Sequence, residues 1–578
     1  MSDNTRPRGL GGLWDRLRTR FFYRVSVTGT TRLPSLGGGL IVSNHVSPVD
    51  PELIWRALHS TGGRELADRL EFLPVEREAD GEPNTDPDLI ARAREKLKAG
   101  GLVCLFAEGR VPRSGKLLRF THAMEELVRD LNVPIIPLAI DRPWGSLVQI
   151  RGGKARWKWP RRFPYPVNMR FGESLAPSSS AFRVRLAVQE QQASLLASRI
   201  YPSETLPNKF IRAARRFPFR LAMVDHSGKE LSFLKALAGT IALRARLKTR
   251  LEEDQRVGVL LPPTVGGALV NAALGMLGKV AVNLNYTASP EIYRYCVEKA
   301  KLKRVLTSKK FLEKIGWEAS EEMLFLEDVL PEVTIFRRIG ALLAASLLPT
   351  RALCRLYSKP TDPNAPVAVL FSSGSTGNPK GVVLSHFNIL SNVQGMAQLL
   401  DFQPTDRIMG VLPFFHAFGY AVTLWFPLAA GYGAIYFPNP RDGRQVAKLI
   451  HKHRGTVIVC PPTFFQMYLR QCDPEQLRSL RYAIAGAEKL KAVLARQFEE
   501  RFGLPLLEGY GATELSPAVS LNTFDSRDGD DVEVGRKSGS IGHPLPGVAV
   551  KAVHLDTGED LDAGEEGMLL VKGPNVML

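Results

Sequence analysis

A loop of small polar residues between two apolar runs could hold an anion. The apolar residues 367–371 predict a buried strand, residues 382–384 predict a second one, and the loop between them ends at Lys380. Its bare backbone N–H groups and hydroxyls can face a bound polyphosphate, and Lys380 adds a positive charge. Pro379 stands where a Walker loop needs glycine, so the loop is of another class; a flexible surface turn is the alternative. The candidate phosphate ligands are Ser372, Ser373, Gly374, Ser375, Thr376, Gly377 and Lys380.

A histidine and an aspartate near the start of the chain could activate a hydroxyl group. Residues 39–43 predict a short strand, and His45 and Asp50 follow it closely. A histidine held by a carboxylate can remove a proton from an alcohol, and the alcohol can then attack an activated acyl group. Asp50 could instead be only the N-cap of a helix that begins at Pro51. Both interpretations of Asp50, catalytic partner and structural cap, are open at this point.

Three later segments extend this pattern. Arg77 follows an apolar run, a predicted strand over 102–107 leads into Glu108-Gly109-Arg110, and residues 132–140 predict another strand. With His45 and Asp50, this order over roughly residues 25–175 resembles the glycerophospholipid acyltransferase family. The resemblance implies that His45 and Asp50 are catalytic. It also implies that a lysophospholipid is bound by Arg77, Glu108, Gly109 and Arg110.

One departure from the broad acyltransferase pattern is informative. Ala107 replaces the usual proline, and Arg110 directly follows Gly109. This Glu-Gly-Arg form resembles the acyltransferase half of a fused bacterial family, the bifunctional acyl-[acyl-carrier-protein] synthetases and 2-acylglycerophosphoethanolamine acyltransferases.

Four short segments after the phosphate loop carry further candidate residues. Each is weak alone, since His416 among aromatic residues could be a packed core histidine and residues 510–514 could form an ordinary turn. In this order, and with the loop, they resemble the acyl-adenylate-forming ligases. The four segments are Pro413–Gly419, Ala485–Leu490, Glu508–Glu514 and Ile541–Gly547.

The ligase resemblance implies ATP and Mg²⁺ as cofactors. A carboxylate would attack the α-phosphate of ATP to give acyl-adenylate and pyrophosphate, which requires mainly positioning and charge neutralisation. The resemblance implies adenine contacts from Gly486, Ala487 and Tyr510, an acyl channel at His416, a phosphate contact from Thr513, and Mg²⁺ on Glu514. The match stops within the third subdomain at Leu578. We therefore expect the family's small C-terminal lobe to be missing and ligase turnover to be impaired.

The predicted fold class is α/β in both halves. A chain of 578 residues is too long for one core, and 44% hydrophobic with 23% charged residues indicates a folded protein. We predict a glycerolipid acyltransferase α/β domain with its linker over residues 1–205. Residues 206–578 are predicted to form the large part of an adenylate-forming ligase, with two flavodoxin-like α/β subdomains and an incomplete β-barrel.

Positive charge is concentrated in the first part of the chain. Residues 1–220 contain 36 Lys and Arg against 22 Asp and Glu, within a total net charge of +18. The natural partner is an anionic surface, either nucleic acid or the cytoplasmic face of a membrane. Residues 151–163 interleave basic and aromatic side chains and could serve either partner. Beside an acyltransferase pattern, contact with lipid headgroups is favoured.

An apolar segment in the second half of the chain could be either of two kinds of helix. Residues 339–348 are apolar and are flanked by four arginines, at 337, 338, 351 and 355. The run is too short to span a membrane. It could be an interfacial helix or a core helix, and the core helix is slightly favoured.

The leading hypothesis is a two-part phospholipid repair enzyme. Its partners would be acyl carrier protein, a fatty acid, a lysophospholipid and a membrane surface, with no nucleic acid. It would lie peripherally on the cytoplasmic face of the bacterial inner membrane. One rival is an acyltransferase whose ligase part binds nucleotide without turnover. The other is a basic nucleic-acid-binding protein.

Overall fold

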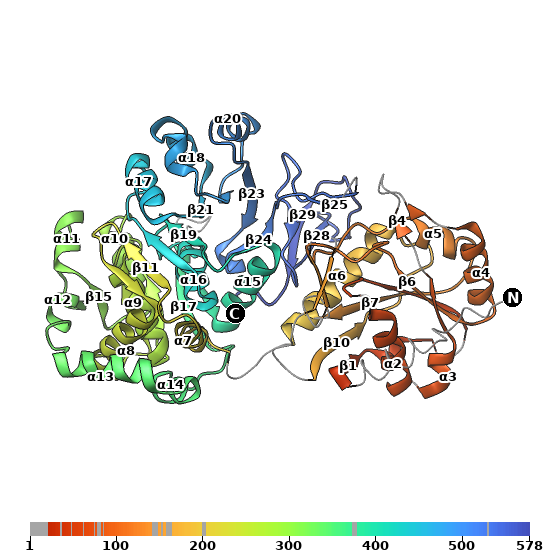
Figure 1. Cartoon of the computed structure of the whole chain (residues 1–578), viewed down its shortest axis with the longest axis horizontal. Coiled ribbons are helices and arrows are strands. Elements are labelled where there is room, and N and C mark those ends of the chain that lie inside the picture. Colours follow the sequence, from red (N-terminus) through yellow and green to blue (C-terminus); the bar gives the residue numbers. More distant parts are fainter. Residues whose placement is uncertain are drawn as a thin grey trace. The chain divides into compact units, whose positions relative to one another are not determined.

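In the computed structural model, two compact units are formed from interleaved parts of the chain. The first contains residues 1–199, 524–535 and 544–574, and the second contains residues 200–523, 536–543 and 575–578. The structure describes residues 21–34, 37–47, 49–61, 63–73, 76–77, 83–84, 86–141, 148–151, 154–157, 164–198, 204–372, 378–528 and 531–578. Figure 1 shows the elements, coloured along the sequence.

A six-stranded sheet organises the first unit. The apolar run at residues 39–43 forms a strand, as predicted, and all five of its residues are buried. Strands this apolar are typical of sheets covered on both faces. All neighbouring strands are parallel except β10 and β7. In sheet order the strands are β1 (Tyr23–Thr28), β10 (Tyr165–Phe171), β7 (Ile135–Asp141), β2 (Gly39–Ser43), β6 (Leu102–Phe106) and β3 (Leu70–Leu73).

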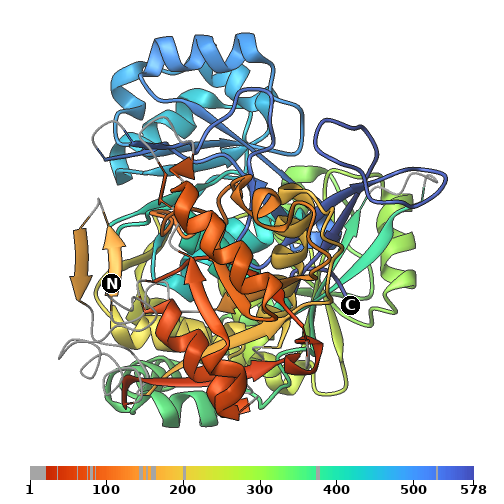
Figure 2. The ribbon, with the colours of Figure 1, turned by 90° about the vertical axis from the view of Figure 1, so that its right-hand side faces the viewer.

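Helices cover both faces of this sheet. Because side chains alternate along a strand, Leu40 and Val42 join one core with α4, α5 and α6, while Ile41 joins another core with α2 and α3. Figure 2 shows these helices in red to yellow. Their bounds are α2 (Asp50–Thr61), α3 (Gly63–Asp68), α4 (Pro87–Lys98), α5 (Ala123–Val128) and α6 (Ala181–Ala197).

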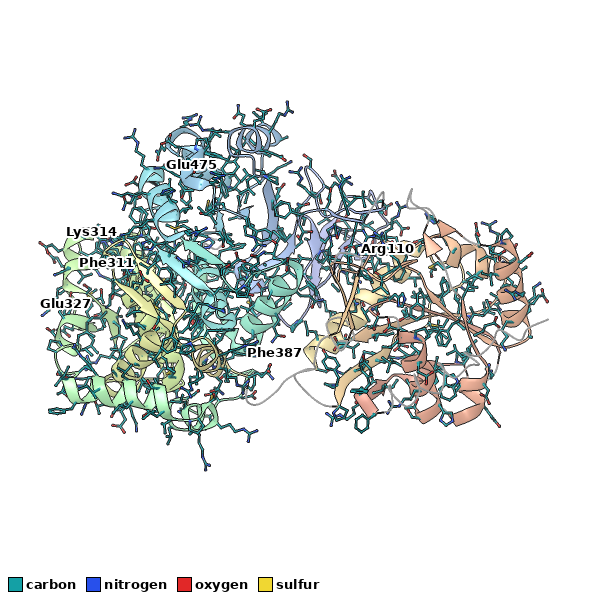
Figure 3. The ribbon with its side chains drawn as sticks, in the orientation of Figure 1. Arg110, Phe311, Lys314, Glu327, Phe387 and Glu475 are labelled. Carbon is teal, nitrogen blue, oxygen red and sulfur yellow. The ribbon has the colours of Figure 1, made fainter. Side chains whose placement is uncertain are left out.

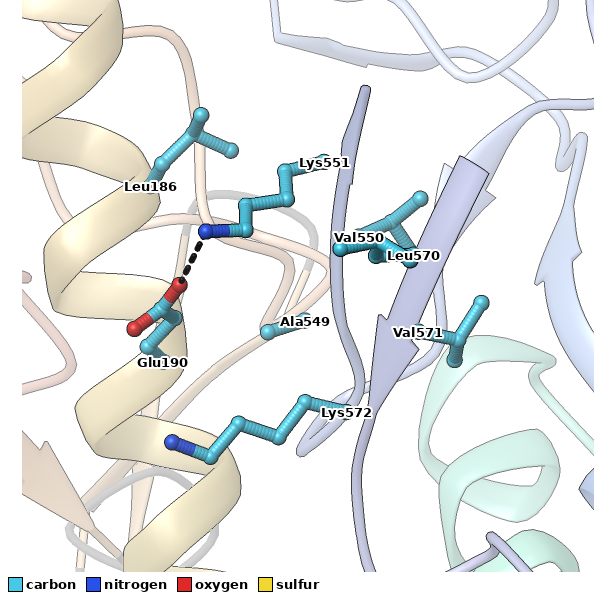
Figure 4. A pocket seen from close by; sticks show the side chains of 8 residues that line it. All are labelled: Leu186, Glu190, Ala549, Val550, Lys551, Leu570, Val571 and Lys572. Carbon is cyan, nitrogen blue, oxygen red and sulfur yellow. Dashed lines mark ion pairs between the residues drawn. The ribbon is translucent and has the colours of Figure 1, made fainter. Parts of the chain in front are cut away.

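Small antiparallel pairs complete the first unit. Strands β28 (Ala549–Val553) and β29 (Met568–Lys572) pair with each other, and β28 contacts α6. A cavity of about 410 Å³ lies between them, and Lys551 Nζ is 3.9 Å from Glu190 Oε1 across it (Figure 4). The other pairs are β25 (Ser526–Asp528) with β26 (Asp531–Glu533), β4 (Glu76–Arg77) with β5 (Pro83–Asn84), and β8 (Val148–Arg151) with β9 (Lys154–Trp157).

The second unit contains a nine-stranded sheet. Most of its strands are parallel, and those at its centre are short and fully buried. The order is β12 (Glu230–Ser232), β11 (Leu221–Asp225), β20 (Gly433–Tyr436), β19 (Arg407–Gly410), β21 (Val457–Cys460), β22 (Tyr482–Ala485), β23 (Leu506–Gly511), β24 (Ala518–Leu521) and β27 (His543–Pro544).

A six-stranded sheet lies beside it in the same unit. The two apolar runs around the phosphate loop form antiparallel strands here, as the sequence predicts. The order is β16 (Met323–Phe325), β15 (Val305–Thr307), β13 (Arg256–Val259), β14 (Val280–Asn283), β17 (Pro366–Ser372) and β18 (Lys380–Ser385).

Local signals account for many helix ends in this unit. In α9 (Val265–Leu277), Thr264 accepts a hydrogen bond from Gly267 N at the start, and Gly278 ends the helix with φ +67°. The remaining principal helices are α7 (Leu206–Arg216), α8 (Phe233–Arg250), α10 (Pro290–Lys299), α11 (Lys309–Ile315), α13 (Ile335–Leu347), α14 (Thr350–Tyr357), α15 (His386–Leu399), α17 (Gly443–His453), α18 (Pro462–Gln471) and α20 (Ala492–Phe502). Within the described ranges, no helix is long and apolar enough to cross a membrane.

Candidate active sites

His45 and Asp50 form a hydrogen-bonded pair beyond the end of β2. Asp50 Oδ2 lies 2.9 Å from His45 Nδ1, so Nδ1 donates and Nε2 is the nitrogen left to accept a proton. The His45 side chain is 18% exposed and the Asp50 side chain is fully buried. A substrate can therefore reach the ring, while its carboxylate partner is shielded from water.

The hydrogen bonds of Asp50 correct the simple cap interpretation. Its Oδ2 also accepts hydrogen bonds from Val46 N at 2.7 Å and Ser47 N at 2.8 Å. Both donors precede the helix, so the carboxylate holds the turn that carries His45. Burial raises the pKa of Asp50 above its ordinary value, and the hydrogen bonds from His45, Val46 and Ser47 oppose this rise.

Glu108 joins the second acyltransferase segment to the first. Its Oε1 accepts a hydrogen bond from His45 N at 2.7 Å, and its Oε2 accepts one from Leu118 N at 2.7 Å. The side chain is fully buried, and this burial raises the pKa of Glu108 to about 8. Within the described residues, Glu108 thus supports the backbone of the candidate base.

Aromatic packing orients the His45 ring. The ring stacks on Phe106, with 4.4 Å between ring centroids, and Phe106 stacks in turn on Phe72. Phe106 is the last residue of β6, so the sheet that places Glu108 also places this ring. The face of the imidazole is held while its edge stays accessible.

The other predicted lipid-binding residues are Gly109, Arg110 and Arg77. Gly109 turns the chain after β6 with φ +69°, a conformation that favours glycine. Arg110 follows it and is half-buried (Figure 3). Arg77 belongs to the short strand β4, and its side chain lies outside the described residues.

The second candidate site is built around the hairpin of β17 and β18. Ser372 ends β17 and is paired in register with Lys380, the first residue of β18 and an exposed one. The chain therefore leaves and re-enters the sheet with these two residues side by side. The other predicted loop ligands, Ser373, Gly374, Ser375, Thr376 and Gly377, lie outside the described residues.

Thr513 and Glu514 lie close to this hairpin. Both belong to the short helix η3 (Thr513–Leu515), which contacts β18. Both are half-exposed, so a ligand can reach them. The structure thus brings together two predicted phosphate-site segments that are more than a hundred residues apart in the chain.

The predicted adenine residues lie on two neighbouring strands of the nine-stranded sheet or directly after them. Gly486 and Ala487 come directly after β22, and Tyr510 lies on the adjacent strand β23. A Cβ on Gly486 would lie 3.4 Å from Gly509 O and 3.6 Å from the Phe418 ring. Ala487 adopts φ +69°, which is unusual for a residue with a Cβ and is often found at binding sites.

His416 is not the packed core histidine that its aromatic neighbours allow. Its side chain is exposed, and its ring stacks against Phe418 at 6.1 Å between centroids. Enough protein surrounds the ring that desolvation lowers the pKa of His416. Through Phe418 and Gly486, His416 is connected to the predicted adenine segment.

Comparison with known proteins shows two domains in this chain. Residues 210–578 match the family model described as AMP-binding enzyme. The chain belongs to the AMP-binding enzyme family. Residues 24–141 match the model described as Acyltransferase, so an acyltransferase domain precedes the AMP-binding domain.

Individual relatives match about two thirds of this chain or less. A long-chain-fatty-acid–CoA ligase of Bacillus subtilis (strain 168) is 27% identical over 403 residues, 65% of this chain and 70% of that protein. A probable 4-coumarate–CoA ligase 1 of Dictyostelium discoideum is 37% identical over 226 residues, 38% of this chain and 39% of that protein. The crystal structure of ATP-bound MatB from Rhodopseudomonas palustris has a TM-score of 0.51 and 26% identity, covering 64% of this chain and 71% of that one.

These matches confirm the predicted α/β fold, with a mixed-sheet AMP-binding domain after an N-terminal acyltransferase domain. The match to the AMP-binding model indicates that this domain binds a nucleotide.

Glu514 is the predicted Mg²⁺ ligand. Among the described residues, no group of three or more His, Cys, Asp or Glu could hold a metal ion by itself. A single carboxylate still fits Mg²⁺, because this ion commonly takes one or two carboxylates together with nucleotide phosphates. Glu514, next to Thr513, fits that requirement.

Asn44 is a site residue that sequence reasoning missed. Its side chain donates to Ile140 O at 3.1 Å and accepts from Ile140 N at 2.8 Å, which ties the end of β2 to β7. It is buried and directly precedes His45. A buried amide beside a candidate base was the available signal, but its partner lies 96 residues away.

Proposed function

We propose that this chain activates a fatty acid with ATP, loads it on acyl carrier protein and transfers the acyl group to a lysophospholipid hydroxyl. The acyltransferase domain, with its linker, would comprise residues 1–205 and the ligase domain residues 206–578. The observation that carries the proposal is the His45–Asp50 hydrogen bond in a chain that also belongs to the AMP-binding enzymes. Acyl activation and acyl transfer are successive steps, and one chain has a domain suited to each.

Acyl transfer would use His45 as the general base. His45 Nε2 takes the proton of the lysophospholipid hydroxyl while that oxygen attacks the thioester carbonyl carbon. The carbon–sulfur bond breaks, and the thiol leaves with the proton returned by His45. Asp50 stabilises the imidazolium form between these events through the Nδ1 hydrogen bond.

Substrate binding would use the segment after β6. Arg110 can bind the phosphate of the lysophospholipid, and Gly109 allows the backbone to turn there. Arg77 is proposed as a second phosphate contact. Glu108 is buried and bonded to two backbone N–H groups, so its proposed part in this site is to support the binding loop.

Fatty acid activation would occur at the β17–β18 hairpin. The fatty acid carboxylate attacks the α-phosphate of ATP, and pyrophosphate leaves. The loop from Ser372 to Gly377, Lys380 and Thr513 would hold the phosphates, and His416 would border the acyl chain. Mg²⁺ held by Glu514 would supply charge neutralisation at these phosphates. Gly486, Ala487 and Tyr510 would border the adenine.

The proposed thiol acceptor is acyl carrier protein. The Bacillus subtilis relative carries CoA in its name, so CoA is the competing acceptor. The fusion of the two domains favours the carrier protein. The acyl thioester made by the ligase domain is used by the acyltransferase domain of the same chain. Loading assays with each thiol at equal concentration would decide between them.

The proposed location is the cytoplasmic face of the bacterial inner membrane, with peripheral attachment. The +18 net charge supports attraction to an anionic surface. Neither site requires nucleic acid, so nucleic-acid binding is the less economical use of this charge.

The deciding experiment separates the two sites. His45→Ala should lower acyl transfer from pre-formed acyl carrier thioester to a lysophospholipid by ~10²–10⁴-fold, the usual effect of losing a general base. ATP–pyrophosphate exchange with a long-chain fatty acid should stay unchanged. Normal transfer by the variant would refute the acyltransferase assignment. Absence of fatty-acid-dependent exchange in the unmodified chain would favour a ligase part without turnover.

A further inference from the structure

Helix α13 presents large apolar side chains to solvent. Phe336 is 81% exposed and Leu347 is 73% exposed. The others recur at helical spacing, so they share one face of the helix. The slightly favoured expectation of a core helix is therefore wrong for this face. The exposed apolar residues are Ile335, Phe336, Ile339, Leu342, Leu343 and Leu347.

The opposite side of α13 is firmly packed. Ala341 and Ala345 are buried, and α13 contacts α8. Arg215 of α7 donates hydrogen bonds to Ala345 O at 3.0 Å and to Ser346 O at 2.7 Å. With small residues facing the unit and its last carbonyls bonded, the helix cannot turn its large residues inward without losing these contacts.

The charged residues of the segment that carries this face have one sign. Residues 333–361 contain Arg337, Arg338, Arg351, Arg355 and Lys359, and no acidic residue. The preceding acid, Glu332, is already paired with Arg246 and Arg250 of α8. None of the described carboxylates forms an ion pair with Arg337, Arg351 or Arg355, and all three are exposed.

A basic groove of about 980 Å³ lies along α14, the helix that follows α13 in the chain. Its lining includes Arg351, Arg355 and Lys359, together with Arg212 of α7 and one acid, Asp362. Four cations against one anion suit a phosphate-bearing headgroup.

We propose that α13 and α14 form a membrane-docking face that inserts into the interface of an anionic phospholipid bilayer. The large side chains of α13 would enter the acyl boundary, while the arginines and the groove of α14 would meet lipid phosphates. A helix with bulky apolar residues on one side and only basic residues around them has the composition of an interfacial helix. A bilayer is favoured over an acidic carrier protein as the partner. Six large exposed apolar side chains can enter a lipid layer, whereas binding an acidic protein through charge requires only the basic residues.

The proposal deepens the membrane attachment proposed above and names its surface. Vesicle binding requires no substrate, so its failure can be told apart from failure of the acyl transfer assignment. The face belongs to the second unit, away in sequence from the basic stretch at residues 151–163. Each surface can therefore be changed without changing the other.

The first test is co-sedimentation of the full chain with vesicles of phosphatidylglycerol and phosphatidylcholine in equal amounts. Ile339→Glu with Leu343→Glu should weaken binding by about tenfold or more, because two inserted apolar residues become charged. Val493→Glu is the matched control, since Val493 is 63% exposed on α20, and it should bind within about twofold of the parent. Arg337→Gln, Arg351→Gln and Arg355→Gln together should weaken binding to anionic vesicles and leave neutral vesicles unaffected.

The second test reports insertion locally. A cysteine at Leu347 labelled with an environment-sensitive nitrobenzoxadiazole dye should brighten several-fold when vesicles are added. The same label at Val493 corrects for reaction with native cysteines and should not brighten. Unchanged vesicle binding by the Ile339 and Leu343 variant, or no brightening at Leu347, would overturn the proposal. So would a loss of self-association or of carrier-protein binding in that variant with vesicle binding intact, because another occupant would then cover the face.

Discussion

Glu108 Oε1 accepts a hydrogen bond from the backbone N–H of His45 at 2.7 Å, although the two residues are 63 positions apart. The contact joins the carboxyl ends of β2 and β6, which are neighbours in the sheet. Glu108 Oε2 accepts a hydrogen bond from Leu118 N, so one buried carboxyl group supports both the candidate base and the chain after the Glu-Gly-Arg segment. Any change at Glu108 should therefore affect the acyltransferase site and the stability of the first unit together.

Glu108 makes stability depend on pH. Its pKa is about 8 in the folded chain against an ordinary 4.5. The folded state then binds more protons than the unfolded state between these values, so this group's contribution to stability falls as pH rises. Relative to the parent, Glu108→Gln should gain a few kcal/mol of unfolding free energy between pH 5 and pH 9, at 1.36 kcal/mol per pKa unit. Denaturant unfolding at each pH measures it.

The control for this experiment is Glu475→Gln. Glu475 is exposed near the start of a short surface helix (Figure 3). Its substitution should change the unfolding free energy by less than about 0.5 kcal/mol. If Glu108→Gln behaved like this control, the carboxyl group of Glu108 would not be held in its neutral form by burial.

Asp50→Asn should impair acyl transfer without abolishing folding. An amide of the same shape fills the buried space, and its oxygen can accept hydrogen bonds where Oδ2 now accepts three, but it carries no negative charge. Transfer rates should fall by ~10²–10⁴-fold, because the imidazolium form of His45 loses its charge partner. The exposed Asp88→Asn on α4 should have the parent rate. A rate near normal in Asp50→Asn would limit Asp50 to holding the turn.

Lys380→Ala should impair only the ligase reaction. Lys380 is exposed at the start of β18, beside Ser372, and β18 contacts the helix that carries Thr513. Removing one preorganised charge near a phosphate typically costs ~10²–10³-fold in rate. Fatty-acid-dependent pyrophosphate exchange should fall by that factor, while transfer from pre-formed thioester stays constant. Lys448→Ala, on the exposed side of α17, is the charge-matched control; an equal loss there would implicate overall charge instead.

Salt should weaken attachment to anionic vesicles. Exposed charges are screened over ~8–10 Å at physiological salt, so the charge-dependent part of binding should decline as salt rises. Replacing the basic residues 154, 156, 158, 161 and 162 by Gln should release a further part, although their side chains lie outside the described residues. The α13 double variant described above should add to this loss. Equal binding to neutral and anionic vesicles would argue against an electrostatic contribution.

Short-range features were predictable from the sequence. Apolar runs at residues 39–43, 102–106 and 367–371 form strands, and they could be predicted because each run consists of consecutive residues. The order of short motifs was sufficient to indicate an acyltransferase domain followed by an AMP-binding domain, since each motif lies in a few consecutive residues.

Only the tertiary structure decided which of these residues share an environment. Glu108 meets His45, and Asn44 meets Ile140, because parallel strands bring distant segments together; no local pattern encodes either partner. The same reason applies to α13. Its sequence fits a buried helix or an interfacial one, and its neighbours determine the outcome. They pack against Ala341 and Ala345 and leave Phe336 and Leu347 in solvent. Burial of a side chain depends on which residues pack against it in three dimensions, and the sequence gives only its neighbours along the chain.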